Sequence, residues 1–227
     1  MDNQKRGVLL FSGGLDSTTT LYHAIQNGYI LDLITFSYSQ KHLIEIEKAK
    51  LFSNLLNIKN HLVYNLDPSI FINSALTSNL QVPKNRKNIL EEKNIPVTYV
   101  PARNLIFLSI ATAYAESHSI ENIFIGINNI DYSGYPDCRP NFINSCEKTI
   151  NLATGKNNIQ IHSPLLNMTK IEIIQYALKL NVPFEHTWSC YDPLIKNNIL
   201  KPCQECDSCL IRIDAFNKAG LIDPSYK

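Results

Sequence analysis

Short apolar runs alternate with longer amphipathic stretches over the first part of the chain. The apolar runs cover 7–11, 30–36 and 61–65, and apolar side chains recur at helical spacing over 16–26 and 41–57. Short apolar runs are typical of buried strands, and helical spacing over ten or more residues is typical of helices that pack one face on a sheet. The order predicts an α/β protein, in which a Rossmann-like parallel sheet carries helices on both faces and a ligand site at the carboxyl ends of its strands.

A long irregular stretch separates this part from the next predicted elements. Residues 66–99 show no periodicity and contain three prolines. Loops beyond about 15 residues are uncommon in compact domains unless they cover a site, so we expect a lid here. A helix that is apolar on nearly all sides is expected over 103–115. Two more strands and a helix opened by a capping box are expected at 122–126, 159–162 and from Thr169.

A glycine turn joins the first predicted strand to the first predicted helix. Its residues are Phe11, Ser12, Gly13, Gly14, Leu15, Asp16, Ser17 and Thr18. Glycines let the backbone turn sharply, and a new helix offers free N–H groups and the positive end of its dipole, so an anion is expected there. The hydroxyls of Ser12, Ser17 and Thr18 can donate to phosphate oxygens, and the Asp16 carboxylate beside phosphate indicates magnesium.

This turn resembles the pyrophosphate loop of ATP pyrophosphatases, which transfer AMP from ATP to a substrate oxygen. The resemblance implies that residues 11–18 bind ATP. A kinase-type phosphate loop is absent, because Thr154-Gly155-Lys156 lacks both the upstream glycine and the following hydroxyl. The alternative is a plain strand-to-helix turn that uses serine and glycine for geometry alone.

The charge and hydropathy of the chain argue against a nucleic-acid partner and against a membrane partner. Lys and Arg total 21 against 20 for Asp and Glu, so no strong field favours a nucleic-acid backbone, and small molecules are expected in place of a stable nucleic-acid partner. No run approaches the ~20 apolar residues that span a bilayer. We therefore expect a cytoplasmic protein without a membrane partner.

Cysteines near the end of the chain have the spacing of a metal site. Cys203, Cys206 and Cys209 are each three residues apart, and Cys190 precedes them. Disulfides are rare in the cytosol, and four thiolates suit a tetrahedral zinc ion whose full coordination makes it structural. A [4Fe–4S] cluster is the main alternative, and four buried free thiols are another. We predict two units, an ATP-binding body over 1–185 and a zinc-binding tail over 186–227.

A polar, aromatic segment over residues 126–142 follows the strand predicted at 122–126. Its candidate substrate-binding residues are Asp131, Tyr132, Tyr135, Asp137 and Arg139. Tyrosine rings offer flat faces, carboxylates can accept hydrogen bonds from a guanine-like edge, and an arginine can bind a carboxylate with two hydrogen bonds. A tyrosine-rich surface turn is the alternative interpretation.

Taken together, these segments resemble the 7-cyano-7-deazaguanine synthase family over nearly the entire chain. The motifs that carry the resemblance are residues 12–17, Tyr38-Ser39-Gln40-Lys41-His42, Pro101-Ala102-Arg103-Asn104, residues 131–139, Thr187-Trp188-Ser189-Cys190-Tyr191 and the three-cysteine tail. The resemblance implies an adenine nucleotide alpha-hydrolase-like fold. It also implies an ATP-dependent carbon–nitrogen ligase of queuosine biosynthesis, which converts 7-carboxy-7-deazaguanine and ammonia to the nitrile through an adenylated intermediate.

The resemblance also suggests roles for single residues. It implies that Asp16, Ser17 and Arg103 are catalytic, that Arg103 contacts a phosphate or the substrate carboxylate, and that Lys41 and His42 lie near the ATP phosphates. Free ammonia is the expected nitrogen donor, because the chain contains no glutaminase-like segment. Two departures from the family pattern, Ser39 in place of glycine and a longer 190–203 interval, concern loop shape.

Two rival functions share some of these features. A tRNA-modifying adenylase has the same loop, but it should carry a basic RNA-binding extension, and the balanced charge speaks against one. A nucleotide-binding regulatory module with a zinc-stabilised tail would bind ATP without releasing pyrophosphate, and it would leave Asp16 without a purpose. A homodimer could form through the apolar helix 103–115 and the tail.

Overall fold

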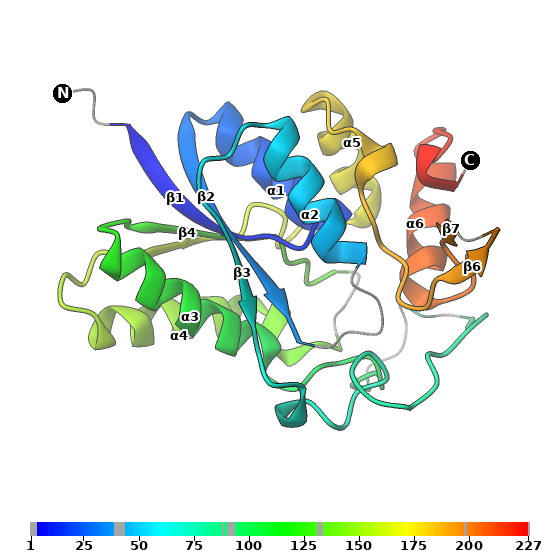
Figure 1. The fold of residues 1–227 in the computed structure, drawn as a ribbon, viewed down its shortest axis with the longest axis horizontal. Helices are drawn as coiled ribbons and strands as arrows, with labels where there is room; N and C mark the ends of the chain where they lie inside the picture. The colour runs from blue at the N-terminus through cyan, green and yellow to red at the C-terminus, as the bar shows by residue number, and fades with distance from the viewer. Residues whose placement is uncertain are drawn as a thin grey trace.

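Five parallel strands form the central sheet of the protein. The computed structural model describes residues 4–38, 44–87, 89, 94–130, 134–197 and 199–226. The strands are β1 (Lys5–Leu10), β2 (Tyr29–Ser37), β3 (His61–Asn65), β4 (Asn122–Ile125) and β5 (Gln160–His162). They lie in the order β3-β2-β1-β4-β5 and every adjacent pair is parallel (Figure 1). The predicted Rossmann-like sheet is confirmed, with small shifts at the strand ends.

Helices cover both faces of this sheet, as predicted (Figure 1). The helices are α1 (Leu15–Gln26), α2 (Ile44–Leu55), α3 (Arg103–Ser117), α4 (Pro140–Ala153), α5 (Lys170–Lys179) and α6 (Asp207–Lys218). Alternate side chains of β1 point to opposite faces. Leu9 belongs to the cluster that contains Leu21 of α1 and Phe52 of α2, whereas Val8 belongs to the cluster that contains Leu108 of α3.

The strand order reverses between β1 and β4, and this places the ligand site. From β1 the chain moves outward through β2 to β3, then returns to the other side of β1 to form β4. In open parallel sheets, the crevice at such a reversal lies beyond the carboxyl ends of the two strands and is where ligands bind. The glycine turn after β1 and the segment after β4 meet there, since a Cβ built on Gly126 would lie 2.7 Å from the Ser17 Cα atom.

Helix α4 was not predicted, although its sequence carries a signal for it. The predicted substrate segment extends to residue 142, yet the helix already begins at Pro140, and Ile143, Cys146 and Ile150 are its buried residues. Proline suits the first position of a helix, and the three buried side chains recur at helical spacing. The loop interpretation was therefore too long at its end.

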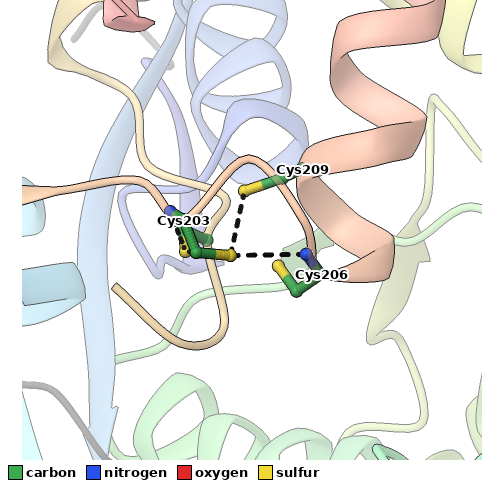
Figure 2. A group of neighbouring side chains, drawn as sticks. Cys203, Cys206 and Cys209 are labelled. Carbon is green, nitrogen blue, oxygen red and sulfur yellow. Dashed lines mark hydrogen bonds between the residues drawn. The ribbon is translucent and has the colours of Figure 1, made fainter. Parts of the chain in front are cut away.

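The tail contacts the body closely. Phe216 of α6 and Ile174 of α5 belong to one buried cluster with Leu15 of α1. A short antiparallel hairpin, β6 (Leu194–Lys196) and β7 (Ile199–Lys201), precedes α6. Cys203, Cys206 and Cys209 gather at the start of α6 (Figure 2). The division near residue 185 stays a prediction.

The long irregular stretch has little regular structure where it is described. Over residues 66–87, 89 and 94–99 it contains one short 3-10 helix, η1 (Pro68–Ile70). Phe71 and Ala75 are buried in the same cluster as the cysteines. No helix in the described part of the chain combines the length and the apolar character that crossing a bilayer requires.

Candidate active site

A cavity opens beyond the carboxyl ends of β1, β2 and β4. Its wall includes six residues of the glycine turn, namely Phe11, Ser12, Gly14, Leu15, Asp16 and Ser17. Gly14 is the N-cap of α1 and makes no side-chain cap, so the first N–H groups of this helix are left for a ligand. Ser12 Oγ and Ser17 Oγ lie 3.0 Å apart, and Ser12 Oγ accepts a hydrogen bond from the Gly14 N–H at 3.2 Å.

The other two residues predicted for this loop lie away from the cavity wall. Gly13 adopts a φ of +73°, and a Cβ there would lie 2.7 Å from the backbone nitrogen of Ala49. Its role is thus to let the loop pass closely over α2. Thr18 is fully buried, and its hydroxyl has no hydrogen-bond partner among the described residues. The Thr18 hydroxyl therefore lies inside the protein, and its predicted contact with a phosphate stays a prediction.

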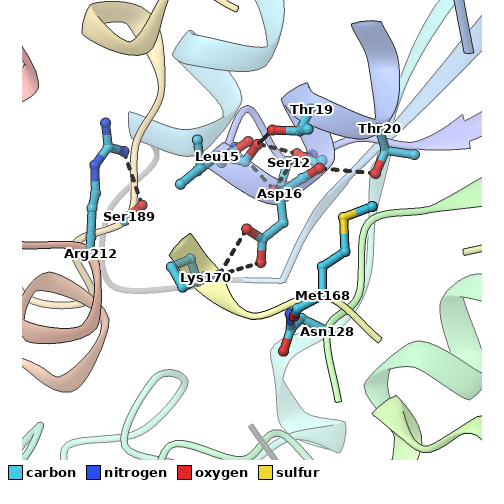
Figure 3. A network of polar contacts seen from close by, with 12 residues as sticks. Ser12, Leu15, Asp16, Thr19, Thr20, Asn128, Met168, Lys170, Ser189 and Arg212 are labelled. Carbon is cyan, nitrogen blue, oxygen red and sulfur yellow. Dashed lines mark hydrogen bonds and ion pairs between the residues drawn. The ribbon is translucent and has the colours of Figure 1, made fainter. Parts of the chain in front are cut away.

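The carboxylate of Asp16 is bound by Lys170, a residue that sequence reasoning missed. Lys170 Nζ lies 2.8 Å from each carboxylate oxygen of Asp16 (Figure 3). Lys170 is buried and both side chains are on the cavity wall. The lysine is the first residue of α5, where the helix dipole disfavours a cation. A lysine at this unfavourable position, directly after the capping residue Thr169, is the sequence signal that could have identified Lys170 as a site residue.

Further hydrogen bonds order the backbone near Asp16 and near Lys170. Thr19 Oγ1 donates to the Leu15 carbonyl at 2.8 Å and Thr20 Oγ1 to the Asp16 carbonyl at 3.0 Å. The side-chain amide of Asn128, on the segment after β4, donates to the Met168 carbonyl just before α5. These bonds lie around Asp16 in Figure 3. These bonds order the first turns of α1 and join the segment before α5 to the segment after β4.

Arg103 extends the positive side of the cavity. It is the first residue of α3, and its Nη1 donates to the Tyr38 hydroxyl at 3.3 Å. Burial opposes its charge, but Tyr38, Tyr135 and Asp137 together raise the pKa of Arg103 above its ordinary value. The guanidinium is therefore a permanent cation on the wall, suited to a phosphate or a carboxylate.

The predicted substrate residues reach different places. Tyr135 is on the cavity wall, and its hydroxyl lies 2.9 Å from Thr98 Oγ1. Asp137 is buried, and its carboxylate accepts a hydrogen bond from the backbone N–H of Asn104 at 3.0 Å. This oxygen satisfies the free start of α3, which gives Asp137 a structural partner.

Arg139 is exposed at the N-cap of α4 and is not part of the cavity wall. Its predicted role in binding the substrate stays a prediction. Four further predicted site residues fall outside the residues that the structure describes: Lys41, His42, Asp131 and Tyr132.

The four tail cysteines form a compact, buried group. Their sulfur atoms all lie within 4.8 Å of one another. Four sulfurs that are each about 2.3 Å from a central zinc ion would be roughly 3.8 Å apart, so the cluster has the dimensions of a tetrahedral site. The sulfur of Cys203 accepts hydrogen bonds from the N–H groups of Glu205 at 3.5 Å and Cys206 at 3.3 Å. Hydrogen bonds from Cys190 and Cys206 lower the pKa of the Cys209 thiol. The donor set fits a thiolate-bound metal.

The segment that contains Cys190 is also part of the cavity wall. The Trp188 N–H donates to the Gly13 carbonyl at 3.1 Å, and its indole N–H donates to the Cys190 carbonyl at 2.9 Å. Ser189 lies on the wall, and Arg212 of α6 donates to its hydroxyl at 3.1 Å (Figure 3). The cysteine centre and the glycine turn are therefore joined through a few residues of backbone.

The long loop is attached to the same tail. Arg86 Nε lies 3.0 Å from Asp207 Oδ1, and Lys84 Nζ lies 3.1 Å from Asp192. The Asn85 N–H donates to the Glu205 carbonyl at 2.8 Å. We call these contacts between residues 84–86 and the tail the latch. It was not predicted, since no local pattern relates the two segments.

Comparisons with known proteins find relatives of this chain over nearly its whole length. The family model described as queuosine biosynthesis protein QueC matches residues 6–220. The 7-cyano-7-deazaguanine synthase of Desulfatibacillum aliphaticivorans is 47% identical, over 98% of this chain and 96% of the relative. That of Geobacter sp. (strain M21) is 48% identical, over 97% of each. A solved structure titled a predicted subunit of tRNA methyltransferase from Methanocaldococcus jannaschii has a TM-score of 0.49 and 19% identity, and covers 98% of this chain and 92% of its own. The match over 6–220 and the nearly full-length relatives show that the chain belongs to the queuosine biosynthesis protein QueC family.

Proposed function

We propose that this protein is a 7-cyano-7-deazaguanine synthase, an ATP-dependent ligase that converts 7-carboxy-7-deazaguanine and ammonia to the nitrile. The observation that carries the proposal is the family match over residues 6–220, with relatives of that name at 47% and 48% identity. The cavity supports it, because an uncapped helix start, the Asp16 carboxylate and the cations Lys170 and Arg103 lie together on its wall.

The chemistry explains why a pyrophosphate loop is needed. A carboxylate oxygen is a very poor leaving group, so ammonia cannot displace it directly. Transfer of AMP from ATP to that oxygen makes it part of a phosphate that can leave, and pyrophosphate is released. Ammonia then forms the C–N bond as AMP departs, which yields the amide. A second transfer of AMP, now to the amide oxygen, lets that oxygen leave as AMP and the remaining N–H protons go to solvent as the nitrile forms.

Residues of the cavity have distinct parts in these steps. The hydroxyls of Ser12 and Ser17 and the free N–H groups at the start of α1 bind the departing pyrophosphate. Lys170, fixed on Asp16, adds positive charge where that group leaves. Arg103 holds the substrate carboxylate against the α-phosphate.

Two metal ions complete the proposal. Magnesium, when bound with ATP at Asp16, supplies charge that offsets the phosphates. Zinc at Cys190, Cys203, Cys206 and Cys209 is structural, because four thiolates leave no open position. We further infer that the protein is cytoplasmic, uses only small-molecule substrates, has no stable nucleic-acid partner, and could form a homodimer.

The test is to incubate the purified protein with ATP, magnesium, ammonium and 7-carboxy-7-deazaguanine. The base is followed by mass spectrometry and the nucleotide by chromatography, with the Asp16→Asn variant as a matched control. The nitrile should appear together with AMP and pyrophosphate. ADP as the only nucleotide product would refute adenylation. An unchanged base with ATP bound would refute the substrate and favour a binding module, or a tRNA as the next substrate to test.

A further inference from the structure

Glu45 is the second carboxylate on the cavity wall. The only two acidic residues among the wall residues that the structure describes are Asp16 and Glu45. Both oxygens of Asp16 are bound by Lys170. Glu45 has no side-chain hydrogen bond and no ion pair to any described residue. A partly buried carboxylate on a cavity wall that has no partner among the described residues is available to a ligand.

Its surroundings make Glu45 a better base than an ordinary glutamate. It lies in the first turn of α2, and among the described residues the charged and titratable groups that act on it from neighbouring elements are Arg103 of α3 and Tyr38 after β2. Burial raises the pKa of Glu45, and the Arg103 guanidinium only partly opposes this. A carboxylate whose pKa is moved toward neutrality takes up protons more effectively under working conditions.

The nitrogen donor creates a need for such a group. At neutral pH almost all ammonia is present as ammonium, which is a cation and has no lone pair with which to attack. The other charged side chains on the wall do not meet this need, since Lys170, Arg103 and Arg212 repel a cation, and Asp16 is bound by Lys170 and is the residue proposed to hold magnesium. A cavity that consumes ammonia therefore requires a carboxylate that attracts ammonium and removes one proton.

We propose that Glu45 binds the ammonium ion and takes its proton, so that the resulting ammonia attacks the adenylated carboxyl carbon. One N–H bond of ammonium breaks and its proton goes to the Glu45 carboxylate. The nitrogen lone pair then forms the C–N bond, and the C–O bond to AMP breaks with its electron pair on AMP. The attached nitrogen releases one further proton to solvent, which leaves the neutral amide. Glu45 afterwards gives the proton to solvent. This inference rests on the proposed function, because it needs ammonia as the nucleophile.

The test separates adenylation from amide formation. Exchange of radiolabelled pyrophosphate into ATP, with 7-carboxy-7-deazaguanine present and ammonium absent, reports adenylation alone. Nitrile formation with ammonium reports the whole reaction. Hydroxylamine is a weaker base than ammonia and is uncharged at neutral pH, so hydroxamate formation from it needs neither cation binding nor loss of a proton before attack. The variants are Glu45→Gln and, as a matched control from the same helix turn, Glu47→Gln, since Glu47 is exposed.

Glu45→Gln should keep the pyrophosphate exchange rate and the KM for the acid. Nitrile formation should fall by about 100-fold or more, with a raised KM for ammonium, because general base catalysis contributes about 10²–10⁴-fold. Hydroxamate formation should be nearly unchanged, and Glu47→Gln should resemble the unsubstituted protein throughout.

Several results would overturn the assignment. Loss of pyrophosphate exchange or a raised KM for the acid in Glu45→Gln would mean that Glu45 supports Arg103 or the fold. An equal loss with hydroxylamine and ammonium would exclude proton removal, and unchanged nitrile formation would exclude any role. If the unsubstituted protein shows neither exchange nor nitrile, the proposed function itself fails, and the inference fails with it.

Discussion

Arg212 connects the last helix to the cavity wall, and its removal has a calculable cost. Its guanidinium donates to both carboxylate oxygens of Asp223, at 2.6 and 3.0 Å. It also donates to the hydroxyls of Thr187 and Ser189 and to the Phe184 carbonyl. The side chains of Arg212 and Asp223 are only 3% and 5% exposed. All five N–H groups of the arginine are therefore used inside the protein.

We expect Arg212→Met to leave the Asp223 carboxylate buried with Ser225 as its remaining described partner. Removing one partner of a buried ion pair costs about 3–5 kcal/mol. For a chain of this size, that corresponds to a fall in Tm of about 6–20 °C. The double substitution Arg212→Met with Asp223→Asn should cost less than the single one, since no uncompensated charge remains.

Urea unfolding in zinc-saturated buffer measures these free energies. The single tryptophan, Trp188, is buried in the segment that Arg212 supports, so its fluorescence reports the transition. The control is Lys218→Met, because Lys218 pairs with Asp214 on the surface of the same helix, and exposed pairs contribute about 0–1 kcal/mol. The reasoning is refuted if Arg212→Met costs no more than this control, or if the double variant is no more stable than the single one.

Three further substitutions test other contacts. Cys203→Ser should lose bound zinc, which mass spectrometry of the metal measures. Because the latch attaches residues 66–99 to the tail that zinc stabilises, the variant should also be cleaved faster by protease in this stretch. An unchanged cleavage rate would contradict this. Lys170→Met should lower the rate of pyrophosphate exchange by about 10²–10³-fold, because the positive charge beside the departing pyrophosphate is lost. An exchange rate equal to that of the unsubstituted protein would exclude this role of Lys170. Gly126→Ala should lower the free energy of unfolding by about 1–3 kcal/mol, because the new Cβ would lie 2.7 Å from the backbone of α1. Gly155→Ala, whose nearest neighbour is 3.6 Å away, should have no measurable effect in the same urea titration.

The sequence by itself determined the local elements and the character of the loop. Apolar runs and helical spacing are properties of consecutive residues, so they predicted the five strands and most helices. The turn after β1 was predictable because its backbone demands glycine, as the φ of +73° at Gly13 shows. The cysteine spacing indicated a metal site, because three of the four ligands are close in sequence.

The tertiary structure alone decided which distant residues come together at the cavity and at the tail. Lys170 lies 154 positions from Asp16, Arg86 lies 121 from Asp207, and Trp188 meets Gly13 from the far end of the chain. Arg139, by contrast, was expected at the site and is exposed at the start of α4, where it is not part of the cavity wall. Periodicity and backbone preference act over a few residues, whereas these contacts depend on how strand order and crossovers bring remote segments together. No local pattern carries that information.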